Sequence, residues 1–129
     1  MDNLDYCDYD TCVALYELGL TFEDASQTFE RNLFTNRYEE IPRPSLYEAQ
    51  KWLREKEIYV SVIPEYNEFR PVKGVKYRLE IAHWKDDDFG YETIEWRDEE
   101  DPHVVCCFDS YEEALLKGIK EAIRVLKEK

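Results

Sequence analysis

The end of the chain carries the pattern that most restricts its fold. Apolar side chains recur there at intervals that place them on one stripe of an α-helix: Leu115, Ile119, Ala122 and Leu126. Ser110 and Glu113 have the spacing of a capping box, so we predict a helix over 110–127. Gly118 inside this helix costs about 1 kcal/mol relative to alanine. We expect the compensation to be a close approach of the helix backbone to a sheet.

The sheet that would cover this helix is predicted between about residues 57 and 108. The clearest alternation runs over 75–84, where every second side chain from Val75 to His83 is expected to be buried and the others exposed. Shorter runs around 58–63, 94–96 and 104–108 supply further strands. Pro64 is expected to end the first of these runs.

A second amphipathic helix is predicted over 46–56. Ser45 and Glu48 form a capping box, and Leu46, Ala49 and Leu53 share one stripe. Together these patterns predict an α+β fold. Its antiparallel sheet of three to four strands (about 57–108) has helices 46–56 and 110–127 packed on one face, and a short N-terminal helix is added.

Residues 1–41 precede this helix–sheet–helix core of 42–129. Asp10 or Thr11 is expected to cap a short helix that ends at Gly19. Residues 27–41 fit either a strand pair or an irregular helix, because their apolar spacing matches neither period well. We therefore predict 1–41 as a helical or irregular segment. No repeat or linker divides the chain, which indicates a single domain of 1–129.

The charge of the chain limits its partners. Acidic residues number 30 and basic residues 17, which gives a formal net charge of −13. Such a surface repels phosphate backbones, so the composition argues against nucleic acid as a partner. No apolar run is long enough for a membrane helix, and the first residues do not have the pattern of a signal peptide. We therefore expect a cytoplasmic protein without membrane contact.

Two segments resemble a known group of proteins. These are 44–56 (PSLYEAQKWLREK) and 111–123 (YEEALLKGIKEAI), with a looser match at 10–19. They are similar to segments of short uncharacterised proteins encoded by phages and prophages of gut Bacteroidetes, which carry a Q-K-W-L-R-E segment, a variable β region and a terminal helix in this order. The resemblance implies a phage or mobile-element origin. It implies no activity, and no catalytic residue is carried over from it.

The sequence does not indicate a reaction centre or a cofactor. Cys7, Cys12, His103 and the cysteine pair at 106–107 are enough ligands for a zinc ion, but their spacing departs from that of structural zinc sites. Buried apolar cysteines are the expected alternative. No nucleophile lies in the glycine-rich turn typical of an activated serine or cysteine, so we predict no catalytic residue, no metal and a non-enzymatic protein.

An unusual number of aromatic residues indicates a binding surface. The chain has 10 tyrosines and 3 tryptophans. Trp84 is predicted on the exposed face of its strand beside Lys76 and Arg78, and with Tyr59 these residues are the interface candidates. The alternative is that the N-terminal segment covers Trp84. The sequence thus predicts a protein–protein interaction module, which binds a protein partner or a second copy. The alternative functions are a nucleic-acid-binding accessory domain that uses the basic residues of 70–78 and a zinc-binding protein.

Overall fold

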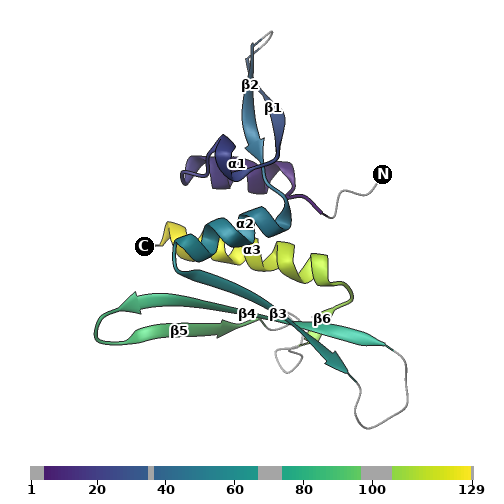
Figure 1. The fold of residues 1–129 in the computed structure, drawn as a ribbon, viewed down its shortest axis with the longest axis vertical. Helices are drawn as coiled ribbons and strands as arrows, with labels where there is room; N and C mark the ends of the chain where they lie inside the picture. The colour runs from purple at the N-terminus through teal and green to yellow at the C-terminus, as the bar shows by residue number, and fades with distance from the viewer. Residues whose placement is uncertain (1–4, 35–36, 67–73, 97–105, 129) are drawn as a thin grey trace.

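A computed structural model describes residues 5–34, 37–66, 74–96 and 106–128. The elements are α1 (Tyr9–Glu17), the short 3-10 helix η1 (Phe22–Asp24), β1 (Gln27–Phe34), β2 (Arg37–Arg43), α2 (Leu46–Glu55), β3 (Ile58–Tyr66), β4 (Val75–Asp86), β5 (Gly90–Glu95), β6 (Cys106–Phe108) and α3 (Tyr111–Lys127). In Figure 1 the strands β3 to β6 form one layer and α2 and α3 form a second. The helix α1 and the β1–β2 hairpin lie beyond these helices.

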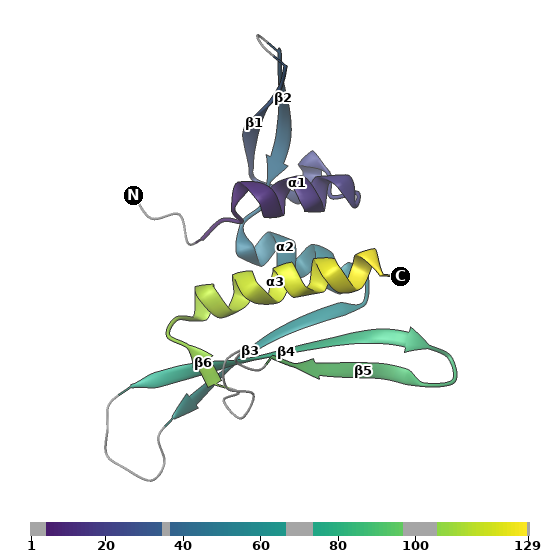
Figure 2. The ribbon, with the colours of Figure 1, turned by 180° about the vertical axis from the view of Figure 1, so that it is seen from behind.

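The larger sheet is antiparallel and has β4 at its centre. Strand β3 pairs with one edge of β4, while β5 and β6 pair with different parts of the other edge. Ile81 lies opposite Val60 on β3 and Ile94 on β5, and Ile81 and Val60 are buried. Both long helices lie on this inner face of the sheet (Figure 2). The predicted α+β fold with two helices on one face of an antiparallel sheet is confirmed.

Helix α3 lies very close to the sheet. A Cβ atom added to Gly118 would lie 2.4 Å from Cγ1 of Val60 and 2.7 Å from Cδ1 of Leu79, which is closer than carbon atoms approach without a shift. The helix begins as predicted, with the Ser110 hydroxyl accepting a hydrogen bond from the backbone N–H of Glu113 at 3.1 Å. The glycine thus sits where the helix backbone meets the sheet.

One cluster of buried side chains connects the layers. It includes Leu115 and Ile119 of α3, Leu53 of α2, Leu15 of α1 and Ile41 of β2. Each of these side chains is at most 4% exposed. At about 1.5–3 kcal/mol for each fully buried aliphatic side chain, this burial outweighs any single surface ion pair. The N-terminal elements therefore share the core of the helix–sheet body.

Of the two alternatives for residues 27–41, the strand pair is the one that forms, so the description of 1–41 as only helical or irregular is corrected there. Strands β1 and β2 form an antiparallel hairpin in which Phe29 lies opposite Ile41. Two residues further along β1, on the same face of the hairpin, Arg31 lies opposite Glu39, and their side chains form an ion pair at 2.6 Å. Because this charged pair lies on the same face as Phe29 and Ile41, the alternation of apolar and polar residues that indicates a strand is interrupted in the sequence. The hairpin projects from the body in both views (Figures 1 and 2).

Two boundaries also differ from the prediction. The N-cap of α1 is Asp8, whose carboxylate accepts a hydrogen bond from the backbone N–H of Thr11 at 2.9 Å, so the helix begins earlier than expected. Strand β3 continues through Pro64, which lies opposite Tyr77, to Tyr66. Because β3 is an edge strand, the missing N–H of the proline does not interrupt the sheet. No described helix has the length and apolar character needed to cross a membrane.

Candidate protein-binding face of the sheet

The outer face of the larger sheet, opposite the helices, carries three neighbouring aromatic rings. Residues directly opposite each other in an antiparallel pair point to the same face, and successive residues alternate. Since His83 is buried on the inner face, Trp84 lies on the outer face, where Tyr91 of β5 is directly opposite it. Tyr59 of β3 is opposite Ala82, one rung further along the same face. We call Tyr59, Trp84 and Tyr91 the aromatic face.

The three rings are packed edge to face and leave contact area open to solvent. The centroids of Trp84 and Tyr91 are 5.2 Å apart at an interplanar angle of 81°, and those of Tyr59 and Tyr91 are 6.1 Å apart at 62°. Tyr91 is 51% exposed and Tyr59 is 36% exposed, while Trp84 is partly buried. Desolvation by its neighbours and the adjacent Tyr59 hydroxyl raise the pKa of Tyr91 above its usual value. The edge-to-face contacts thus hold the three rings against one another on the surface of the sheet.

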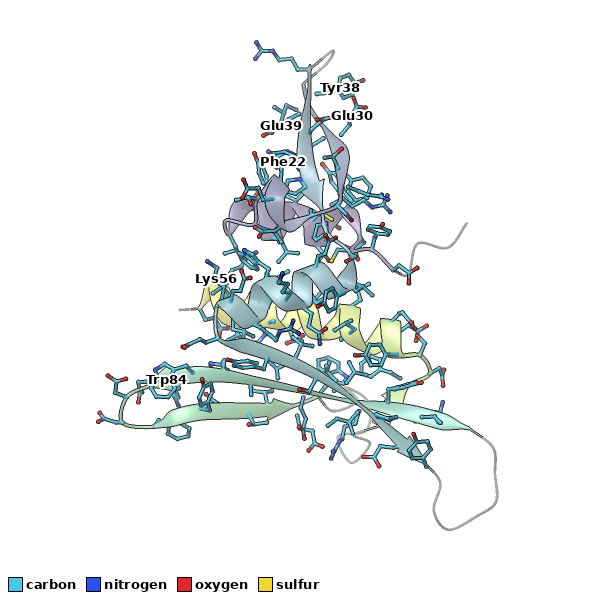
Figure 3. The ribbon with its side chains drawn as sticks, viewed as in Figure 1. Phe22, Glu30, Tyr38, Glu39, Lys56 and Trp84 are labelled. Carbon is cyan, nitrogen blue, oxygen red and sulfur yellow. The ribbon has the colours of Figure 1, made fainter. Side chains whose placement is uncertain are left out.

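The described part of the N-terminal segment lies away from Trp84. Figure 3 shows Trp84 on the sheet, whereas the labelled Phe22, Glu30 and Tyr38 lie on the other side of the helix layer. For the N-terminal residues that the structure describes, this arrangement differs from the alternative in which they cover Trp84. The reason is that α1 packs on β2 and α3, and the helices separate it from the sheet.

Lys76 and Arg78, the two basic interface candidates, are both engaged by carboxylates. The Lys76 ammonium forms an ion pair with Asp109. The Arg78 guanidinium lies 3.4 Å from a carboxylate oxygen of Glu65, 3.4 Å from one of Glu95 and 4.0 Å from one of Glu80. The structure therefore places both candidates on the outer face but pairs their charge internally. It does not form a basic patch from the described part of 70–78, and Arg70 and Lys73 lie outside the described residues.

The turn beside the aromatic face is acidic. Asp86 accepts a hydrogen bond from the backbone N–H of Phe89 at 2.7 Å, and Asp87 and Asp88 follow it in the turn between β4 and β5. Phe89 is 61% exposed, and the Lys85 ammonium lies 4.5 Å from the centre of its ring. The carboxylate of the exposed Glu57 also acts on Tyr91, so negative charge lies near the rings as well as in the turn.

The two thiols near the N-terminus are buried. Cys7 and Cys12 are free and at most 1% exposed, and the Cys12 thiol donates to the carbonyl of Cys7 at 3.5 Å. Burial raises the pKa of Cys12 to about 12 and that of Cys7 further still. Thiolates are the metal ligands and nucleophiles, so these residues serve as apolar core. No group of potential ligands among the described residues could hold a metal ion. His103 and the side chains at 106–107 lie outside the described part.

His83 lies at a cavity of about 470 Å³ between the end of α3 and the β4–β5 strands. Its Nε2 atom is 3.5 Å from a carboxylate oxygen of Glu92, directly opposite on β5. The other lining residues are Lys85, Ile94, Arg124, Val125 and Glu128. The His83–Glu92 pair is a polar contact at the end of the core.

Tyr91 is the member of the aromatic face that the interface candidates did not include. The aromatic composition already pointed to Tyr91 as a surface ring, but its place beside Trp84 follows from the pairing of β4 with β5, which the turn at 85–88 indicates. Comparison with models of protein families, with curated protein sequences and with solved structures finds no match for the chain. The resemblance to phage and prophage proteins therefore stays a prediction.

Proposed function

We propose that this protein is a non-enzymatic protein-binding module that contacts its partner through the aromatic face. The observation that carries the proposal is the cluster of Tyr59, Trp84 and Tyr91 on the sheet face left uncovered by the described helices. Tyrosine and tryptophan are enriched in protein interfaces because they bury a large area and lose little side-chain freedom. Rings that already hold each other in position reduce this entropic cost further.

A different protein suits this surface better than a second copy of the chain. Each copy carries a formal net charge of −13, and the acidic turn with Asp86 adjoins the rings. Two aromatic faces in contact would bring these like charges together, which costs energy at any ionic strength and most at low salt. Self-association through the same surface is therefore the weaker form of the proposal.

A nucleic-acid-binding role finds less support in the geometry. Binding to phosphates requires lysine and arginine side chains that can release counterions. Lys76 and Arg78 instead face carboxylates of the same chain, so phosphates would have to displace these ion pairs. The two described residues on which the nucleic-acid alternative was based are thus engaged within the chain.

A selection from a library of random linear peptides displayed on particles tests the proposal. We expect peptides enriched on the wild-type protein to lose binding to Trp84→Ala and to Tyr91→Ala. The matched control is Tyr38→Ala, which removes an aromatic side chain that is 63% exposed on the distant hairpin. Sedimentation of the free protein tests self-association separately. Selected peptides that bind all three variants equally, or a dimer that Tyr91→Ala dissociates, would overturn the proposal as stated.

A further inference from the structure

We infer that the aromatic face receives a cationic, extended segment of the partner, with arginine or lysine side chains on alternate residues. This inference rests on the proposed function and names the chemistry of the partner. Its basis is the order of side chains along the outer face of β4, in which aromatic and acidic rungs follow one another. The relevant residues on that face of β4 are Arg78, Glu80, Ala82 and Trp84.

The rings form the middle of this series. Trp84 and Tyr91 make one rung, and the next rung combines Tyr59 with the short side chains of Ala82 and Thr93. A cation over the face of a tryptophan or tyrosine is attracted by the ring, and the attraction grows as water is excluded. Lys85 over Phe89 and Lys117 over Trp96, each at 4.5 Å, show that cations of this chain already use its rings in this way.

Carboxylates lie on both sides of the rings. The next outer rung after Ala82 carries Glu80 opposite Glu95. In the other direction the register shifts after Trp84, and the exposed acidic residues Asp86, Asp87 and Asp88 follow at the β4–β5 turn. A partner charge placed on the rings therefore approaches negative charge from two directions. Glu80 and Glu95 also contact the guanidinium of Arg78, so this face already accommodates one arginine between carboxylates.

The spacing favours an extended segment. Outer-face residues on neighbouring rungs are two residues apart, which corresponds to about 6.6–6.8 Å along a strand. Side chains on alternate residues of an extended peptide repeat at the same distance, so one cation can lie on the rings while the next reaches Glu80. The field of a chain with formal charge −13 would also speed the approach of such a segment at low salt.

The test uses two synthetic peptides of equal length. One alternates arginine with threonine, and in the other citrulline replaces every arginine, which keeps the size and hydrogen-bonding group but removes the charge. Calorimetry measures affinity for the full chain, and the indole N–H signals of the three tryptophans in an NMR titration report where the peptide lies. We expect the arginine peptide to bind more tightly, to shift the Trp84 signal and to weaken as salt rises.

The variants separate the named surface from general charge attraction. We expect Tyr91→Ala to weaken the arginine peptide roughly two- to fivefold, as for one exposed cation–aromatic contact. Glu80→Gln should weaken it as well, and the distant Tyr38→Ala should leave it unchanged. Equal affinity for the two peptides, no binding of either, or binding that is insensitive to Tyr91→Ala would overturn the inference. If the library selection yields neutral peptides whose binding is lost in Trp84→Ala, the proposed function holds and the inference of a cationic segment does not.

Discussion

Replacing Gly118 with alanine should destabilise the protein, although alanine is the better helix former. The added methyl group would lie 2.4 Å from Val60 Cγ1 and 2.7 Å from Leu79 Cδ1, and both of these side chains are buried. Val60 cannot rotate away easily, because a β-branched side chain has few favourable rotamers. The helix must therefore move from the sheet or the two side chains must leave their positions.

The magnitude follows from two opposed contributions. Alanine in place of glycine in a helix gains about 1 kcal/mol. Forcing an additional methyl group into a packed core costs typically 1–3 kcal/mol, and contacts to two buried side chains place Gly118→Ala near the upper end. We therefore expect the free energy of unfolding to fall by about 1–2 kcal/mol, which urea denaturation resolves at constant slope.

A double-mutant cycle identifies the cause. Val60→Ala removes the methyl group that Gly118→Ala would strike, so each substitution should cost less in the presence of the other, with a coupling energy of about 1 kcal/mol or more. A Gly118→Ala protein that gains the full helix propensity of about 1 kcal/mol would refute the close approach of α3 to the sheet. Additive effects in the cycle would refute Val60 as the obstacle.

Three further substitutions test other contacts. Glu30 and its cross-strand neighbour Glu40 are both exposed, so Glu30→Lys should raise the free energy of unfolding by roughly 0.2–1 kcal/mol, measured by urea denaturation at low salt. Glu57, two residues beyond the last residue of α2, has a φ of 62°, and Glu57→Gly should raise the thermal midpoint because glycine adopts this conformation without strain. The hydrogen bond from Arg31 lowers the pKa of Glu39 below 4.5. The stability that this carboxylate contributes is therefore complete above that pH and lost as pH falls through the lowered pKa. The difference in urea midpoint between wild type and Glu39→Gln should shrink on acidification, and a constant difference would contradict the pairing.

The helices and the central strand could be predicted because their signals are local. Ser45 and Ser110 mark the beginnings of α2 and α3, and apolar spacing identifies the buried sides of both. The hairpin could not be predicted in the same way, because Ile41 owes its burial to α1 and Arg31 occupies a position where an apolar residue would have completed the pattern. Sequence periodicity does not contain such contacts between distant segments.

The residues of the candidate site also differ in whether local sequence patterns could identify them. Trp84 and Tyr59 were identified because alternation alone assigns a residue to one face of a strand. The position of Tyr91 depends on the pairing of β5 with β4, and the engagement of Arg78 depends on Glu65 from β3 and Glu95 from β5. Which charges remain available to a partner is therefore a property of the assembled sheet and not of any one segment.

The β1–β2 hairpin is joined to the rest of the molecule chiefly at one end. Near α1 it is fastened by the buried Ile41, whereas Glu30 and Tyr38 further out are exposed to water. A pair of strands held in this way can fray from its outer end without disturbing the tryptophan-bearing sheet, since the helix layer lies between them. Local opening of the hairpin can thus occur without opening of the larger sheet. A protease acting on the outer hairpin would leave the aromatic face intact.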